Sequence, residues 1–220
     1  MNLKVLKRLP NPTAGLRGPN RSVSMEQLLE LLNFFLDFIG NRSAYYLTSN
    51  ITKPFKKLLT KPYQLSYSEL VGPGRLDFFV SHFWGTASVH FVESIEQHAK
   101  AKSASHKEYL AFRYWVCFLS NNQWHLEEEV GDGDWRESSF YKALRCGFCP
   151  ATCMVLDQDA LPLTRAWCLC EVLQTYRLEH DESIHNFEGG FFTAPTGVSS
   201  VTATGYASTS ALPWPGGSRR

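Results

Sequence analysis

The sequence predicts an α/β domain over residues 75–194, in which a parallel sheet lies between two layers of helices. Three mostly apolar runs of strand length support this fold: Leu76–Ser81, Phe112–Leu119 and Ala151–Leu156. Helical patterns separate these runs, and strands that alternate with helices at this spacing form parallel sheets covered on both faces. The prediction adds an N-terminal helical extension and a disordered C-terminal tail.

The composition limits the classes of protein. A chain of 220 residues with 44% hydrophobic content favours one globular domain with extensions. The formal net charge of +1 gives no overall signal for nucleic acid or for an anionic membrane. No long apolar window predicts a membrane span, and the basic N-terminus lacks the apolar segment of a secretory signal. Most of the six cysteines fall in predicted core elements, so we expect a reducing, cytoplasmic location.

The N-terminal part is predicted to be disordered over residues 1–23 and to form a helix and a connector over residues 24–74. Ser24 and Gln27 have the spacing of a capping box, and Gly40 is the expected end of the helix. Apolar residues surround this helix almost completely, so it must be buried. Packing on its own domain is one interpretation, and a surface for a partner or for self-association is the other. The connector is expected to contain a short helix at Phe55–Leu59.

Within the domain, the pattern predicts the remaining elements in order. These are a helix at Ala87–Lys102, a polar loop at Ser120–Glu137, a helix over residues 140–146 capped by Ser138 or Ser139, a helix at Thr164–Tyr176 capped by Thr164, and a strand near Gly190–Thr193. Residues 195–220 are rich in Ser, Thr, Gly and Ala without periodicity and are predicted to be disordered. The pattern shows no helix after the last strand, which leaves open whether the domain is complete at this end.

The helix at Thr164–Tyr176 carries the candidate site. Its spacing places the apolar side chains and the stem of Arg165 on one face, on which Cys168 is expected to belong to the core: Cys168, Leu169, Val172, Leu173 and Tyr176. Glu171 lies on the more polar side, one turn after Trp167. Right-handed crossovers put the loops after the strands at one carboxyl edge, which is where open α/β sheets bind ligands. A carboxylate beside an exposed indole at this edge predicts a ligand site.

Two stretches resemble the Toll/interleukin-1 receptor (TIR) domain family. LDFFVSHFWGTASVHFVESIEQHA is similar to the opening strand and helix of TIR domains, and ATCMVLDQDALPLTRAWCLCEVLQ is similar to the plant-type run that ends in a Trp-Cys-Leu-x-Glu helix. The likeness covers about Arg75–Thr193, and its specific part is the WCLxE motif. It implies a three-layer, flavodoxin-like parallel sheet. The Ser-His-Phe-Trp-Gly and Asn-Gln elements also resemble heterokaryon-incompatibility domains.

The resemblance implies an activity and a site. In catalytic TIR domains, the Glu of this motif is essential for cleaving the nicotinamide–ribose bond of NAD, and Glu171 stands at that position. Trp167 is then expected to flank the substrate, and Ser81, His82 and Trp84 to line the same pocket. NAD is the substrate, and no separate cofactor or metal is expected. The resemblance further implies self-association or binding of other TIR-like domains, with no nucleic-acid partner.

Other interpretations stay open beside this one. Glu171 also fits a surface helix position or an ion pair with Arg165 or Arg177, and Trp167 fits a packing role. The acidic loop Ser120–Glu137 departs from the family and would repel a pyrophosphate. Cys146 and Cys149 have the spacing of half a zinc site, but no second half is present. Two functions therefore stand: an NAD-cleaving hydrolase, and a non-catalytic interaction module that uses its acidic loop and N-terminal helix.

Overall fold

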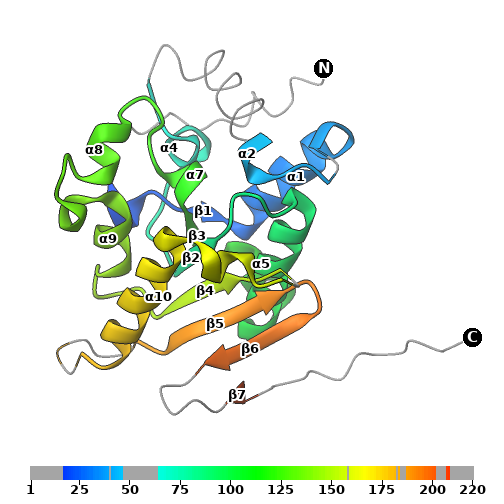
Figure 1. Ribbon diagram of the computed structural model, residues 1–220. Coiled ribbons are helices and arrows are strands. Elements are labelled where there is room, and N and C mark those ends of the chain that lie inside the picture. Colours follow the sequence, from blue (N-terminus) through cyan, green and yellow to red (C-terminus); the bar gives the residue numbers. More distant parts are fainter. Residues whose placement is uncertain are drawn as a thin grey trace, which may run out of the picture.

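The computed structural model describes residues 17–39, 41–46, 64–157, 159–181, 183, 187–201 and 207–208. Its centre is a seven-stranded sheet with the strand order β1-β3-β2-β4-β5-β6-β7 (Figure 1). The four inner strands run parallel to one another: β3 (Arg113–Val116), β2 (Phe78–His82), β4 (Ala151–Val155) and β5 (Gly189–Ala194). The sheet is therefore mixed and mostly parallel in its centre, and the predicted α/β class is confirmed.

Antiparallel strands flank this parallel centre on both sides. β1 (Val23–Ser24) pairs with β3 at one side, and β6 (Gly197–Val201) pairs with β5 at the other. β7 (Ala207–Ser208) then pairs with β6. The segment 195–220, predicted to be disordered, thus contributes two strands in its described residues. A Ser-rich strand without alternating hydrophobicity gives no periodic signal, which explains the error.

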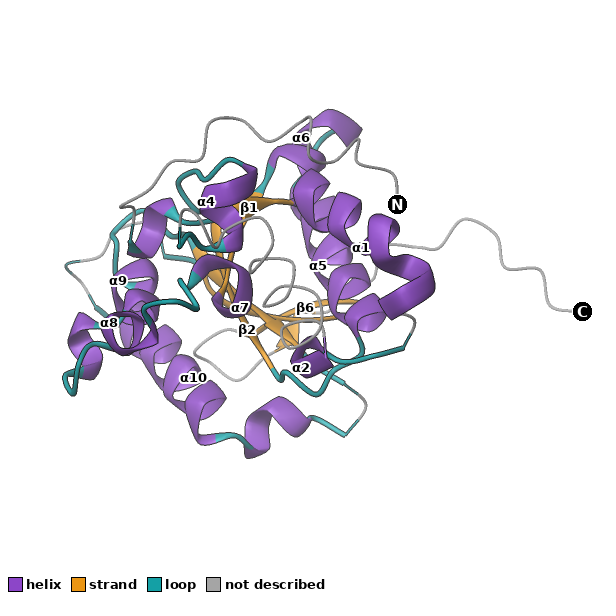
Figure 2. Cartoon of the chain, turned by 90° about the horizontal axis from the view of Figure 1, so that it is seen from above, coloured by secondary structure: helices purple, strands orange, loops and turns teal. Residues whose placement is uncertain are grey.

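The helices connect the strands and cover both faces of the sheet (Figure 2). They are α1 (Met25–Ile39), α2 (Ala44–Tyr46), α4 (Tyr67–Val71), α5 (Ser88–Lys102), α6 (His106–Ala111), α7 (Cys117–Ser120), α8 (Leu126–Val130), α9 (Ser139–Leu144) and α10 (Ala166–Glu179), with 3₁₀ turns η2 (Gly18–Asn20), η4 (Trp135–Glu137) and η5 (Leu161–Thr164). The predicted strand at Phe112–Leu119 ends early, because its last residues form α7. Within the described residues, no helix has the length and apolar character needed to cross a membrane.

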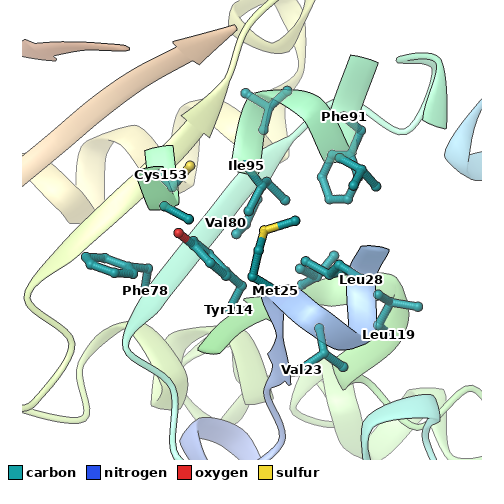
Figure 3. Packing of buried hydrophobic residues seen from close by; sticks show 14 of the residues in the cluster. Val23, Met25, Leu28, Phe78, Val80, Phe91, Ile95, Tyr114, Leu119 and Cys153 are labelled. Carbon is teal, nitrogen blue, oxygen red and sulfur yellow. The ribbon is translucent and has the colours of Figure 1, made fainter. Parts of the chain in front are cut away.

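The core consists of two clusters on opposite faces, because successive strand residues point to opposite sides. Phe78 and Val80 of β2 belong to the cluster under α1 and α5. Phe79, between them, belongs to the cluster under α9 and the end of α10. Figure 3 shows Met25 of α1 inserted between Val80, Tyr114 and Leu28 in the first cluster. Met25 is fully buried, so α1 is part of the domain core.

The capping box predicted for α1 is present. The Ser24 hydroxyl accepts from the Gln27 backbone N–H at 3.1 Å, and the Gln27 side chain accepts from the Ser24 N–H at 2.8 Å. Leu28, Leu31 and Leu32 then pack into the core, which confirms that the helix is buried against its own domain. The predicted helix end at Gly40 and the short helix at Phe55–Leu59 lie outside the described residues.

The segment just before α1 is ordered, contrary to the prediction of disorder up to residue 23. Arg21 is buried and forms ion pairs with Glu69 of α4, at 3.2 Å, and with Glu129 of α8. Glu129 also accepts hydrogen bonds from the Asn122 N–H and the Ser139 hydroxyl. This network fixes residues 18–24 to α4 and to the loop Ser120–Glu137, which contains α8 and η4 rather than an extended polar loop.

Candidate functional site

The candidate site lies where α10 crosses the carboxyl end of β2. Ser81 is the last residue but one of β2, and its hydroxyl donates a hydrogen bond to Glu171 Oε2 at 2.5 Å. Both side chains are buried, with Glu171 only 3% exposed. The structure thus brings together two predicted site residues that are 90 positions apart in the chain.

The orientation of α10 differs in part from the prediction: Cys168 is buried as expected, but Glu171, expected on the polar side, is buried as well. The helix turns its polar side to the sheet and buries Glu171, Gln174 and Thr175, together with Cys168 and Leu178. The apolar residues Leu169, Leu173 and Tyr176 face outward and are 45–54% exposed. The surface under α10 explains this arrangement, because β2 and β4 present hydroxyl groups there.

Two hydrogen bonds match the buried side of α10 to those hydroxyl groups. Ser81 of β2 bonds Glu171, and Thr152 of β4 lies 2.8 Å from the Thr175 hydroxyl. Thr175 also lies 2.9 Å from the Glu171 carbonyl oxygen, one turn earlier. Buried polar groups are stable only when they are paired. The polar face of α10 therefore fits this region of the sheet better than its apolar face would. The predicted N-cap is also wrong, since Thr164 ends η5 and donates to the Leu161 carbonyl.

Burial dominates the titration of Glu171. Removal of the carboxyl group from water raises its pKa to about 8, and the hydrogen bond from Ser81 opposes this shift in part. At neutral pH the acid is therefore mainly protonated. The interpretation of Glu171 as a surface helix residue is therefore wrong, because the carboxyl group is buried at the carboxyl edge of the sheet. The alternative of an ion pair with Arg165 or Arg177 does not fit, because Glu171 faces the sheet.

Two thiols lie beside this carboxyl group. Burial, and to a smaller extent the nearby Glu171, raise the pKa of Cys168 to about 11. The pKa of Cys117 is raised by the same two causes in the same order. Cys117 accepts a hydrogen bond from the Trp84 indole at 3.1 Å, and the Cys168 thiol donates to the His82 carbonyl oxygen at 3.5 Å. Both cysteines are neutral at physiological pH, so neither is an activated nucleophile.

His82 does not join the site, contrary to the prediction. It follows Ser81 in β2 and so points to the opposite face of the sheet. Its ring lies 4.7 Å from the ring of Phe91 and 5.4 Å from that of Phe118. Burial lowers its pKa to about 3, and within the described part of the chain its Nε2 has no hydrogen-bond partner. A neutral, enclosed imidazole of this kind is a core residue.

The two predicted tryptophans also have separate surroundings. Trp84 packs against Tyr45 and Phe118 in the core under α1 and α5, and it reaches the site only through Cys117. Trp167 of α10 is 47% exposed and packs against α9, with its ring 4.6 Å from that of Phe140. The contacts of Trp167 therefore agree with the packing role. They do not agree with a position beside Glu171 in an open pocket.

Several neighbours of Glu171 were not predicted. Cys117 and Thr175 contribute to its surroundings, and their positions depend on where β3 ends and on how α10 is rotated. Neither property has a local sequence signal. Cys146 and Cys149 do not pair with further ligands: among the described residues, no group of three or more metal-binding side chains is present. Cys149 packs into the core under α9.

Comparison of the chain with protein-family models, with curated proteins and with solved structures finds no match.

Proposed function

We propose that this chain is a TIR-like domain that cleaves the nicotinamide–ribose bond of NAD, with Glu171 as the catalytic carboxylate. The observation that carries the proposal is the Ser81–Glu171 hydrogen bond at the carboxyl end of β2. The strand order β3-β2-β4-β5 agrees with the flavodoxin-like order 2-1-3-4. In this chain the antiparallel β6 stands where that fold has its fifth parallel strand.

The chemistry requires one carboxylate. When the bond between C1′ and the nicotinamide nitrogen breaks, its electron pair leaves with nicotinamide and the ribose gains oxocarbenium character. A carboxylate stabilises this charge and holds the ribose hydroxyls. A water oxygen then bonds to C1′, and its proton is released. Ser81 acts as a positioning residue, because its hydrogen bond fixes the carboxyl group and favours the ionised form.

The proposal makes two demands on the site. Glu171 is 3% exposed, so the substrate reaches it only after the structure around the carboxyl group opens. The carboxyl group must also ionise. The positive charge of the nicotinamide ring favours this, since an opposite charge nearby lowers the pKa of a carboxyl group. We therefore expect activity to increase with pH towards and through the pKa of about 8.

The test is release of nicotinamide from NAD by concentrated purified protein, followed by chromatography, for the wild type and Glu171→Gln. The glutamine keeps the shape of the side chain and its ability to accept from Ser81, but it carries no negative charge. Loss of at least about 100-fold in rate, with an unchanged circular dichroism spectrum, supports the proposal. Equal rates in both proteins, or no release by the folded wild type across pH 6 to about pH 9, would reject it.

A second candidate function is a non-catalytic protein–protein interaction module. The outward apolar face of α10 favours it, because Leu169, Leu173 and Tyr176 form a stripe about half exposed to solvent. The N-terminal helix, considered for this role from the sequence, is instead packed into the core. Glu171→Gln separates the two functions, since it removes catalysis and leaves the outer face of α10 unchanged.

A further inference from the structure

The outer face of α10 is apolar and positively charged. Leu169, Leu173 and Tyr176 follow one another at intervals of four and three residues and so lie on one side of the helix. Arg165 and Arg177, both exposed, flank this stripe at its two ends. Arg165 also lies over the ring of Phe83. Of the other charged side chains of α10, Glu171 is buried on another side of the helix and Glu179, partly exposed, is its last residue. We call this surface the α10 stripe.

A second exposed surface has the complementary character. Leu126 and Val130, one turn apart on α8, are 42% and 50% exposed, and Trp135 of η4 is 37% exposed. Glu127 and Glu128 lie between the two α8 residues and are also exposed. Asp132 and Asp134 add further exposed negative charge, and Arg136, also exposed, lies 3.9 Å from Asp134 and leaves the net charge of this surface negative. We call this surface the α8 patch.

The two surfaces lie on the same side of the molecule. α9 stands between them: Tyr141 of α9 contacts Trp135 at a ring distance of 4.7 Å, and Phe140 of α9 contacts Trp167 of α10 at 4.6 Å. Figure 1 shows α8, α9 and α10 following one another along one side of the sheet. A twofold axis near α9 would therefore set the α10 stripe of each copy on the α8 patch of the other.

We propose that two copies of this chain form a symmetric dimer in which each α10 stripe binds the partner's α8 patch. A second copy is the occupant that the surfaces themselves specify, because both surfaces are apolar and they carry opposite net charges. The three apolar side chains of each surface expose on the order of 250 Å², so the two surfaces together would contribute about 500 Å² of apolar area per copy, out of the roughly 800 Å² per partner of a standard interface.

This inference names the partner for the interaction module raised above, and it does not depend on the chemistry of Glu171. It also gives the acidic loop a role different from substrate binding. The contact occurs twice in a twofold dimer, so each charge reversal acts on both halves of the interface. That property permits a specific test with charge reversals on one surface at a time.

The test is the mass of the full chain by sedimentation velocity, from low micromolar to several hundred micromolar concentration. We expect the wild type to form dimers, and Leu173→Glu to weaken the dimer at least tenfold. Arg165→Glu/Arg177→Glu and Glu127→Arg/Glu128→Arg should each be monomeric alone, because like charges then face each other. An equimolar mixture of these two variants should dimerise, since every contact in the mixed pair again joins opposite charges.

Leu36→Glu is the matched control, because Leu36 is 45% exposed on α1, away from both surfaces; it should leave the dimer unchanged. Circular dichroism confirms folding of each variant. A wild type that stays monomeric at every concentration overturns the inference. A dimer that survives Leu173→Glu, or a mixture that stays monomeric while the wild type dimerises, places the contact elsewhere. In that case the proposal of an interaction module is kept and the proposal of this interface is rejected.

Discussion

The Ser81 hydroxyl and the Glu171 carboxyl group form a hydrogen bond of 2.5 Å beneath α10, in surroundings from which water is excluded. The hydrogen bond compensates only part of the cost of burying an ionisable group. The pKa of Glu171 therefore stays raised, at about 8 instead of its ordinary 4.5.

This shift makes the stability of the protein dependent on pH. Between the two pKa values the folded protein binds one more proton than the unfolded chain, so stability falls as pH rises through this range. The expected slope due to Glu171 is at most about 1.4 kcal/mol per pH unit. Glu171→Gln should remove this contribution. Urea unfolding of both proteins between pH 5 and about pH 9 measures it, and parallel stability curves would show that Glu171 is not protonated when buried.

His82 should make the stability of the protein depend on pH in the opposite direction. Its pKa is lowered from 6.5 to about 3, so the unfolded chain takes up a proton that the folded protein does not. Stability due to this residue is therefore lost as pH falls below 6.5. His82→Phe should be tolerated, because the ring lies between Phe91 and Phe118. We expect the variant to gain up to about 1.4 kcal/mol relative to wild type for each pH unit below 6. A constant difference between pH 4 and about pH 7 would contradict the prediction.

Arg21 should be one of the least replaceable residues of the N-terminal segment. It neutralises two buried carboxylates, Glu69 and Glu129, and Arg21→Met would leave both without their cation. We expect a loss of about 3–5 kcal/mol in the free energy of unfolding. Arg136→Met is the control, because that side chain is exposed, with a contact of 3.9 Å to Asp134 and its guanidinium 5.0 Å from the centre of the Trp135 ring; its cost should be below about 1 kcal/mol. Similar losses for the two variants would mean that the buried network contributes little.

Gly131 and Gly133 offer a matched pair in the turn between α8 and η4. Both have positive φ, +90° and +95°. A Cβ at Gly131 would lie 2.0 Å from the Asp134 carbonyl oxygen, whereas a Cβ at Gly133 meets nothing within 4 Å. Gly133→Ala should therefore cost about 1 kcal/mol, the usual cost of a side chain in this backbone conformation. Gly131→Ala should cost at least twice as much, because the turn must also shift. Thermal unfolding of both variants tests the difference, and equal midpoints would contradict it.

The sequence predicted the elements whose signals are local. The inner strands are recognisable as apolar runs, and the cap of α1 depends on Ser24 and Gln27, which are only three residues apart. The same reasoning failed for α10, because it assumes that the apolar face of a helix turns inward. Here the sheet presents Ser81 and Thr152 to the helix, and this matching of hydroxyl groups is a property of three separated segments.

Contacts between residues far apart in the sequence account for the other differences between the predicted and the observed structure. Arg21 meets partners 48 and 108 residues further along the chain, so nothing in residues 1–23 alone indicates that this segment is ordered. β1 has two residues, too few for a recognisable pattern. In the candidate site, Ser81 and Glu171 were placed correctly beside each other, because the carboxyl ends of parallel strands share one edge. His82 was misplaced although it is the next residue, since the alternation of side chains along β2 sends it to the other face.

The antiparallel strands at the two sides of the sheet have a consequence for fragments of this protein. β1 covers the first two residues of β3, and β6 covers β5 from Gly190 to Ala194, so both outer strands of the parallel centre have antiparallel partners. A fragment cut before residue 197 would uncover a row of free N–H and C=O groups on β5. Such exposed rows pair readily with other chains. Aggregation of trimmed fragments would therefore come from lost edge protection, even where the hydrophobic core is intact.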